Sequence, residues 1–156
     1  VPWIGPNWAV SDALVQMVGP YVAEGVLSVS AVPNMDTEAF RKFEQDFVAA
    51  TGVTPLSNPF GAMGYDMMTV VGLAIEAAQS ARAVDFRTQI RNVSRPPGKK
   101  VYSFAEGVAE LRRGNQIDYD GVSSNMDFTD SGEVRPNFGI WQVRAGQFDL
   151  VDIVTL

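Results

Sequence analysis

The stretch from residue 65 to residue 80 restricts what this chain can fold into more than any other segment. Asp66 and Glu76 are its only charged residues, and apolar side chains would surround most of a helix formed here. A helix that is apolar on nearly every side lies between layers of other elements, away from water. Its uncharged centre, residues 67–75, is far shorter than the roughly 20 residues that cross a bilayer. We therefore predict a layered globular structure with this helix buried inside it.

An amphipathic helix precedes this segment. Phe40, Phe43 and Phe47 follow one another at intervals of three and four residues, and charged residues occupy the other faces. This spacing predicts a helix that buries the three phenylalanine rings in the core. Asp36 suits the N-cap and Gly52 the C-terminal end, because aspartate accepts backbone N–H bonds and glycine adopts positive φ.

A capping box marks the start of another helix. Ser103 and Glu106 stand at the spacing at which each side chain accepts a hydrogen bond from the other residue's backbone N–H. Phe104, Val108 and Leu111 form the predicted buried stripe of this helix. Two shorter helices are predicted over residues 11–18 and 84–93, and proline-containing loops over residues 53–60 and 94–100.

Strand patterns lie towards both ends of the chain. Strands are predicted over residues 1–5, 25–32, 127–132, 137–144 and 148–155. The last two alternate apolar and polar residues, and the Ala145-Gly-Gln147 turn between them predicts an antiparallel hairpin. Helices mixed with strands in this way indicate an α/β fold.

The composition excludes several classes of function. Twelve basic and 18 acidic residues give the 156-residue chain a net charge of −6, whereas nucleic acids and anionic membranes bind basic surfaces. The chain has no histidine and no cysteine, which excludes thiol nucleophiles, Ser-His-Asp triads and His or Cys metal sites. We predict no catalytic residues, no metal, no cofactor and no nucleic acid partner.

Two acidic clusters invite a metal or catalytic interpretation. A calcium loop starting at Asp127 would place Gly132 at its sixth position, but its twelfth residue is Phe138 instead of the required glutamate. Asp118 and Asp120 could form an acid–base pair, yet we expect nothing apolar around them that would raise a pKa. We predict solvated turns at both places, and the basic residues 95–100 are predicted to form a solvated loop.

Seven short segments stand in an order and spacing that chance rarely produces. They are IGPN at 4–7, AEGV at 23–26, the helix over 40–52, GYD at 64–66, IDYDG at 117–121, MDFTDSGE at 126–133 and IWQ at 140–142. This order resembles the C-terminal half of type I periplasmic solute-binding proteins of the branched-chain amino acid and amide ABC transporter family, over essentially the whole chain. Residues 123–126 depart from the family pattern, which affects the local turn.

The resemblance implies a fold of two α/β lobes joined by hinge crossings, with a solute trapped between the lobes. It places the crossings of this chain near residues 33–34 and 135–136. Residues 1–33 and 136–156 would form part of the C-terminal lobe, ending in the hairpin, and residues 34–135 part of the N-terminal lobe. The first half of each lobe would be absent, so we expect open strand edges and either self-association or pairing with the missing N-terminal half.

The function implied by the resemblance is non-catalytic solute binding for an ABC importer. The ligand would be a branched-chain amino acid or a related small organic acid or amide, with an aliphatic or aromatic body. The full-length precursor would carry a signal peptide, and the mature protein would lie in the periplasm and dock on an ABC permease. A ligand-sensing regulatory or receptor domain of the same fold is the alternative that the sequence leaves open.

Asn7, Trp8 and Phe60 are the predicted ligand contacts. Asn7 and Trp8 follow the end of a strand, where open α/β sheets bind ligands, and the resemblance places Phe60 on the cleft side of the N-terminal lobe. The resemblance also implies an acid at the position of Asn7 in amino-acid binders, where it holds the ligand ammonium. The neutral amide therefore weakens the case for an α-amino acid, while Trp8 offers a large apolar face.

Each of these residues also has a purely structural interpretation. Asn7 could form a turn, Trp8 could pack on the helix that follows it, and Phe60 could belong to the core. Met63 and Tyr65, which lie close to Phe60 in the sequence, are expected to be core or hinge residues and not ligand contacts.

Overall fold

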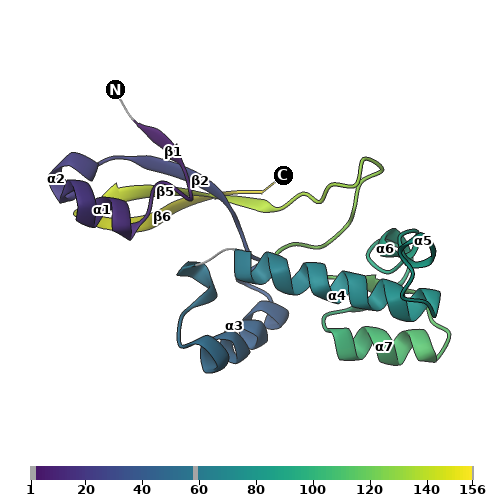
Figure 1. Cartoon of the computed structure of the whole chain (residues 1–156). Coiled ribbons are helices and arrows are strands. Elements are labelled where there is room, and N and C mark those ends of the chain that lie inside the picture. Colours follow the sequence, from purple (N-terminus) through teal and green to yellow (C-terminus); the bar gives the residue numbers. More distant parts are fainter. Residues whose placement is uncertain (1–2, 58–59, 156) are drawn as a thin grey trace. The chain divides into compact units, whose positions relative to one another are not determined.

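The computed structural model describes residues 3–57 and 60–155, and it has the mixed α/β class that the sequence predicts (Figure 1). The chain divides into two compact units. Unit 1 comprises Val1–Val32 and Asn137–Leu156, and unit 2 comprises Pro33–Pro136. The assignment of these units to the C-terminal and N-terminal lobes of the resembled fold stays a prediction.

Unit 1 is a four-stranded sheet with two short helices. Its strands stand in the order β1-β2-β5-β6, with β1 parallel to β2 and the other neighbours antiparallel. The elements are β1 (Ile4–Pro6), α1 (Asp12–Val18), α2 (Pro20–Ala23), β2 (Leu27–Val32), β5 (Asn137–Arg144) and β6 (Gln147–Val154). Because Gly19 has φ of 86° and Pro20 starts a new helix, the chain turns sharply between α1 and α2.

The predicted hairpin is confirmed as β5 and β6. Arg144 pairs with Gln147, so the connection is the two residues Ala145 and Gly146, one shorter than the predicted turn. Their φ angles of 49° and 78° are both positive, which is the geometry that matches the right-handed twist of the two strands. The turn sets the register of β5 with β6 as far as the irregularity between Ile140 and Trp141.

The helices of unit 1 cover one face of the sheet. Val15 of α1 and Ala23 of α2 form a buried cluster with Val10 and with Val143 of β5. On the same face, Trp141 stacks on Phe148 with ring centroids 5.3 Å apart. Alternate residues of the strands point away from this cluster to the opposite face.

Unit 2 packs helices around a very small parallel sheet. Its elements are α3 (Glu38–Thr51), a 3-10 turn (Pro55–Ser57), α4 (Phe60–Ala78), α5 (Ala83–Phe86), α6 (Gln89–Asn92), β3 (Lys99–Val101), α7 (Phe104–Arg112) and β4 (Ile117–Tyr119). Its main core holds Val70 and Leu73 of α4 against Val101, Ile117 and Tyr119 of the strands. A second cluster contains Phe40 and Phe43, which are 2% and 7% exposed as predicted, with Phe47 partly buried beside them.

Several predicted boundaries are wrong. Thr37, and not Asp36, caps α3, because its hydroxyl accepts the backbone N–H of Phe40 at 3.1 Å. Helix α4 begins at Phe60, so this residue is not part of a loop before the helix. The helix predicted over residues 84–93 is broken into α5 and α6.

Two of the wrong predictions concern strands. Residues 127–132 form no strand, because their polar groups bond locally: Thr129 N–H donates to the carbonyl of Glu133, and Gly132 N–H donates to that of Thr129. Strand β3 falls in the segment predicted as a loop, and it exists only through parallel pairing with β4. Three-residue strands are too short to show periodicity in the sequence.

Burial was also mispredicted on two helices. Helix α4 was expected to be buried on every side, but Met67 and Met68 are 60% and 66% exposed. Phe104, predicted in the buried stripe of α7, is 46% exposed, and Gly107 and Glu110 are the buried residues there. The ring of Phe104 instead lies over Gly72 of α4, where an added Cβ would come within 2.7 Å of it.

Candidate functional site

The turn after β1 positions two of the predicted ligand contacts. The backbone carbonyl of Pro6 accepts hydrogen bonds from Ala9 and Val10 at 2.9 and 3.1 Å, which folds residues 7–9 into a tight turn. Asn7 is half-buried in this turn, and Trp8 is 78% exposed. The turn lies at the carboxyl end of a parallel strand pair, the place where α/β sheets bind ligands.

Phe60, the third predicted contact, belongs to unit 2. It is the first residue of α4 and its side chain is 60% exposed. The structure therefore brings Asn7 and Trp8 together in one turn of unit 1, and Phe60 belongs to unit 2. Met63 is half-buried, and Tyr65 packs on Phe43 with ring centroids 5.0 Å apart.

A cavity in unit 2 was missed by the sequence analysis. It has a volume of about 630 Å³ and lies at the carboxyl ends of β3 and β4, between α3 and the start of α7. Three aromatic rings and several charged groups line it, including Lys42, Phe43, Tyr65, Tyr102, Glu106 and Asp120. Burial, and then the charges of Asp66 and Asp46, raise the pKa of Tyr65. The cavity could have been predicted from the ends of β3 and β4. These strands have only three residues each, so the sequence pattern does not show them.

One buried carboxylate organises the segment beside this cavity. Asp66 of α4 is fully buried and accepts hydrogen bonds from the Tyr119 hydroxyl at 2.7 Å, from Val122 N–H at 3.0 Å and from Ser123 N–H at 2.7 Å. Gly121 passes so close that an added Cβ would lie 2.5 Å from a carboxylate oxygen. Burial and the Asp66 charge raise the pKa of Tyr119, so it remains a neutral donor. The GYD segment at 64–66 and the IDYDG segment at 117–121 are thus in direct contact through Asp66.

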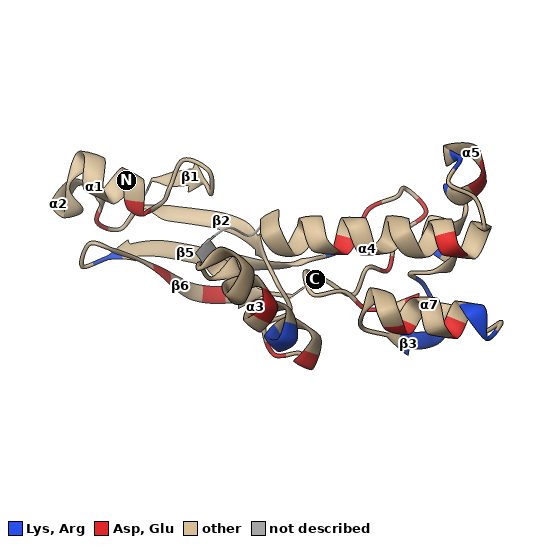
Figure 2. Ribbon diagram, turned by 60° about the horizontal axis from the view of Figure 1, so that its bottom comes forward, with Lys and Arg blue, Asp and Glu red and all other residues tan. Residues whose placement is uncertain are grey.

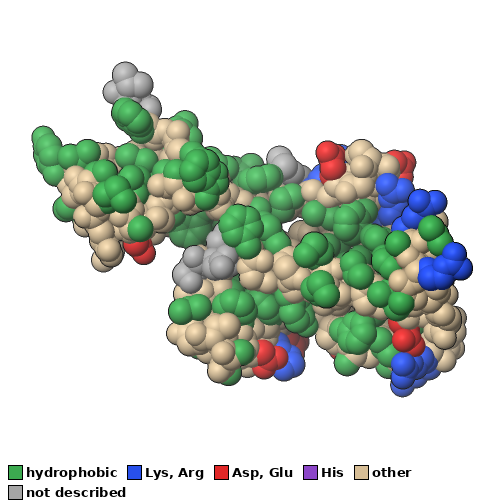
Figure 3. Space-filling model, in the orientation of Figure 1, with side chains coloured by type: hydrophobic (Ala, Val, Ile, Leu, Met, Phe, Trp, Pro, Cys, Tyr) green, Lys and Arg blue, Asp and Glu red, His purple; other side chains and the backbone are tan. Residues whose placement is uncertain are grey.

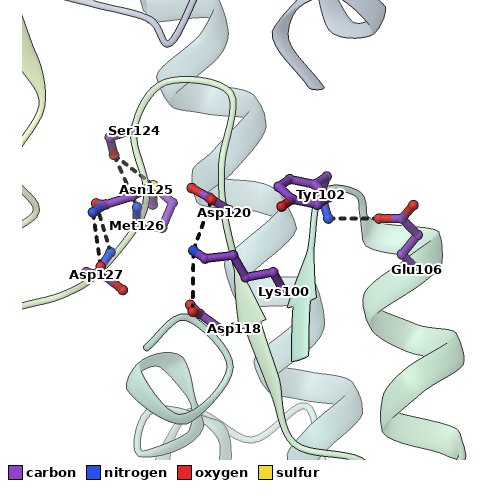
Figure 4. A network of polar contacts seen from close by, with 9 residues as sticks. All are labelled: Lys100, Tyr102, Glu106, Asp118, Asp120, Ser124, Asn125, Met126 and Asp127. Atoms are coloured by element: carbon purple, nitrogen blue, oxygen red, sulfur yellow. Dashed lines mark hydrogen bonds and ion pairs between the residues drawn. The ribbon is translucent and has the colours of Figure 1, made fainter. Parts of the chain in front are cut away.

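The Asp118 and Asp120 pair is not the solvated turn that the sequence predicts. The Asp118 side chain is 3% exposed, and Lys100 Nζ lies 3.5 Å from its carboxylate and 3.0 Å from that of Asp120 (Figure 4). Burial opposes the charge of Lys100, but hydrogen bonding to Asp120 and the charges of both aspartates outweigh it and raise its pKa. Parallel pairing of β3 with β4 places this lysine beside the aspartates.

Asp127 adjoins the same group of side chains. Burial, and then the charge of Asp118, raise its pKa above the ordinary value. In Figure 4 its backbone N–H and one carboxylate oxygen are bonded to the Asn125 amide, at 3.3 and 3.0 Å. These contacts hold the segment after β4 in place. Arg95, which lies before β3, also contributes, because its guanidinium donates to the Phe128 carbonyl at 3.0 Å.

Side chains suited to binding a small molecule lie at the strand ends of the described residues. No group of acidic residues in the described part of the chain is arranged to hold a metal ion. Among residues 3–57 and 60–155, no helix is long and apolar enough to span a membrane. The aromatic and amide side chains at the strand ends can hold an apolar body and a polar head group.

Comparison with known proteins gives the family. The family model described as "Periplasmic binding protein" matches residues 5–114, which is more than half of the chain. A search of the curated proteins found no match.

Solved structures share the fold. The leucine binding protein LivK of Thermotoga maritima has a TM-score of 0.70 at 18% identity, over 99% of this chain and 37% of that protein. The LivJ substrate binding protein of Streptococcus pneumoniae, solved with isoleucine, has a TM-score of 0.63 at 15% identity, over 99% and 37%. A solute binding protein of R. palustris, solved with benzoate, has 0.61 at 15% identity, over 99% and 36%. This chain thus spans little more than a third of the length of each.

Proposed function

Because the chain belongs to the periplasmic binding protein family, we propose that it forms part of the solute-binding component of an ABC importer and acts in the periplasm. The observation that carries the proposal is the family match over residues 5–114, which includes the turn of Asn7 and Trp8 at the end of a parallel strand pair. The role is binding without catalysis. The permease would recognise the ligand-closed form.

Asn7 and Trp8 supply a neutral polar group and an apolar surface. The side-chain amide of half-buried Asn7 has both a donor and an acceptor that a ligand can use. Trp8 exposes most of its ring. An amide pairs well with a carboxylate or another amide, whereas an α-ammonium group needs a negative charge beside it. The ligand class we propose is a small organic acid or amide with an aromatic or aliphatic body.

Phe60 is proposed to contact the same ligand from the other lobe. Its ring stands at the start of α4 and is largely exposed. Closure of two lobes around a solute is a hinge motion in which a few connecting residues absorb the change in φ and ψ. Pro33 and Pro136, the residues of unit 2 that adjoin unit 1 in the sequence, are the proposed hinges.

Titration calorimetry on the complete product of the gene that encodes this sequence tests the proposal. Benzoate, leucine and isoleucine are the probes, and micromolar binding of at least one is expected. Trp8→Ala should weaken that binding at least tenfold, about 1.4 kcal/mol. Trp3→Ala is the matched control, because Trp3 is 77% exposed in the same unit and is assigned no contact. Equal effects of the two substitutions would contradict the assignment of Trp8.

Asn7→Asp separates the two ligand classes. A carboxylate at this position should repel an acid such as benzoate and attract the ammonium of leucine. We expect benzoate affinity to fall at least tenfold in the variant while leucine affinity rises. Unchanged affinities for both compounds would show that residue 7 does not contact the ligand.

A further inference from the structure

The cavity of unit 2 has the size and the lining of a ligand site. Its volume of about 630 Å³ is within the range of cavities that hold small molecules. All of its lining residues lie between positions 37 and 122, so the whole cavity belongs to unit 2. In Figure 3 the surface of this unit is hollowed between α3 and α7, and hydrophobic side chains border the hollow. None of the predicted ligand contacts Asn7, Trp8 and Phe60 lines it.

Three aromatic rings come to the cavity from different parts of unit 2. Phe43 of α3 and Tyr65 of α4 pack with their ring centroids 5.0 Å apart and their planes tilted by 50°. Tyr102 stands between the end of β3 and the start of α7. Phe43 is 7% exposed, whereas Tyr65 and Tyr102 are 39% and 47% exposed. The two tyrosine rings therefore present open surface to a ligand, and Phe43 supports one of them from behind.

The charged residues around these rings are mostly acidic. Four carboxylates and one ammonium group line the cavity, from Glu38, Asp46, Glu106, Asp120 and Lys42. Lys42 pairs with Asp46 at 3.0 Å, and Lys100 pairs with Asp120 at 3.0 Å. Two negative charges remain in excess when both lysines are counted. Figure 2 shows acidic residues in red on both α3 and α7, the helices on the two sides of the cavity.

A carboxylate lies close to each of the two tyrosines. The Glu106 carboxylate accepts the backbone N–H of Tyr102 at 2.8 Å (Figure 4), which fixes this pair at the start of α7. Burial, and then the charges of Asp66 and Asp46, raise the pKa of Tyr65, so Asp46 is near enough to act on this ring. Aromatic faces and negative charges thus alternate around the cavity.

This combination of groups selects an organic cation. The face of an aromatic ring attracts a positive charge, and alkylated ammonium groups are recognised by several rings together. The excess of negative charge repels an anion and adds nothing to the binding of a neutral compound. A metal ion requires oxygen ligands that converge on one point, and no acidic group in the described ranges 3–57 and 60–155 is arranged in that way.

We infer that the cavity of unit 2 is a second ligand site, and that it binds a small organic ammonium ion with alkyl substituents. The rings of Tyr65 and Tyr102 contact the alkylated nitrogen, and Glu106 supplies negative charge beside it. The inference goes beyond the proposed function, because Asn7 and Trp8 of unit 1 are proposed to hold an acid or an amide.

Choline and 3,3-dimethylbutan-1-ol test the inference as a matched pair. The two molecules have the same shape, but the alcohol has a neutral carbon in place of the charged nitrogen. In titration calorimetry on the complete gene product, choline should bind with a Kd below about 1 mM. It should bind at least about tenfold more tightly than the alcohol. Equal affinities for the two compounds, or no heat of binding from choline at about 10 mM, would overturn the inference.

Substitutions at Tyr102 and Glu106 show whether these groups bind the cation. Tyr102→Leu removes the aromatic face and should weaken choline binding at least about fivefold, whereas Tyr102→Phe keeps the face and should retain the affinity. Glu106→Gln removes the charge and should weaken binding about threefold. Tyr21→Leu and Glu24→Gln, at exposed positions of unit 1, are the controls and should have no effect.

The same variants contain the outcomes that would contradict the site. Equal losses in Tyr102→Leu and Tyr102→Phe, or an equal loss in Tyr21→Leu, would overturn the role of the ring. The urea midpoint of each variant shows whether it is folded, and the Phe variant, which changes one hydroxyl, keeps the test valid if the Leu variant unfolds.

Trp8→Ala separates this inference from the proposed function. The substitution should lower the affinity for benzoate, leucine or isoleucine and leave that for choline unchanged. A parallel loss of choline binding would overturn the inference, because choline would then occupy the turn of Asn7 and Trp8. Choline binding by a protein that binds none of the other three compounds would contradict the proposed function and support the second site.

Discussion

The two units are held together by different kinds of interaction. Unit 1 has a long backbone ladder, since β5 and β6 pair at seven positions and the sheet continues through β2 to β1. Unit 2 has a sheet of only two strands of three residues. A ladder of that size is not stable by itself, so side chains must hold it. Buried carboxylates on α4 and α7 supply that support.

This difference predicts which substitutions should lower the stability of each unit. A backbone ladder tolerates changes of exposed side chains, because its hydrogen bonds do not involve them. A buried carboxylate with several donors cannot be replaced without leaving those donors unpaired. All three tryptophans lie in unit 1, so tryptophan fluorescence reports on that unit, while hydrogen exchange reports on both.

Asp66→Asn should have the largest effect. The amide brings two donors into a site where the Tyr119 hydroxyl and the N–H groups of Val122 and Ser123 all need acceptors. We expect a loss of about 3 kcal/mol in the free energy of unfolding of unit 2, from buried donors left unsatisfied. Urea unfolding followed by hydrogen exchange measures it.

Exposed Asp46→Asn on α3 is the control and should change this free energy by less than about 0.5 kcal/mol. Tryptophan fluorescence measures the unfolding of unit 1 in the Asp66→Asn variant. An equal loss of stability there would show that the two units unfold together, which would contradict the difference between them. A loss under about 1 kcal/mol at Asp66 would mean that the backbone of unit 2 is sufficient.

Glu110→Gln should have a smaller, pH-dependent effect. Hydrogen bonds from Lys99 and Asn115 outweigh the burial of Glu110 and lower its pKa from 4.5 to about 2. A carboxylate with a lowered pKa stabilises the fold above its unfolded pKa, and that contribution disappears as the pH falls from about 4.5 to about 2. The wild-type chain should therefore exceed the variant in stability at pH 6, and the difference should vanish near pH 2.

Thermal unfolding at both pH values measures this change, with Glu38→Gln on the first turn of α3 as the control. A stability difference that stays constant from pH 6 to pH 2 would show that Glu110 acts through packing and not through its charge.

Ala145→Gly should have the smallest effect, and it concerns unit 1. Ala145 has φ of 49°, a conformation that glycine adopts without the clash of a Cβ atom. Relief of this strain is partly offset by the greater freedom of glycine in the unfolded chain. We expect a gain of roughly 0.5 kcal/mol in unit 1, seen by tryptophan fluorescence, and no change in unit 2. A loss of stability would mean that the hairpin needs the alanine side chain.

Local patterns in the sequence were sufficient for several elements. The spacing of Phe40 and Phe43 predicted a buried helix face, and the alternation around Ala145 predicted the hairpin, because both depend on backbone periods of 3.6 and 2. Ser103 was correctly predicted as a helix cap, accepting from Glu106 N–H at 3.3 Å. The second hydrogen bond of the predicted capping box is different. The Glu106 carboxylate accepts the backbone N–H of Tyr102 at 2.8 Å, and not that of Ser103.

Tertiary structure alone decided the rest. Asp66 meets partners 53 to 57 residues later in the chain, and Lys100 meets Asp118 only because β3 pairs with β4. No local period encodes such contacts, so Asp118 was mistaken for a solvated residue. The sequence showed that α4 is apolar all round, but packing decided which of its sides faces the core of unit 2, and that choice left Met67 and Met68 exposed.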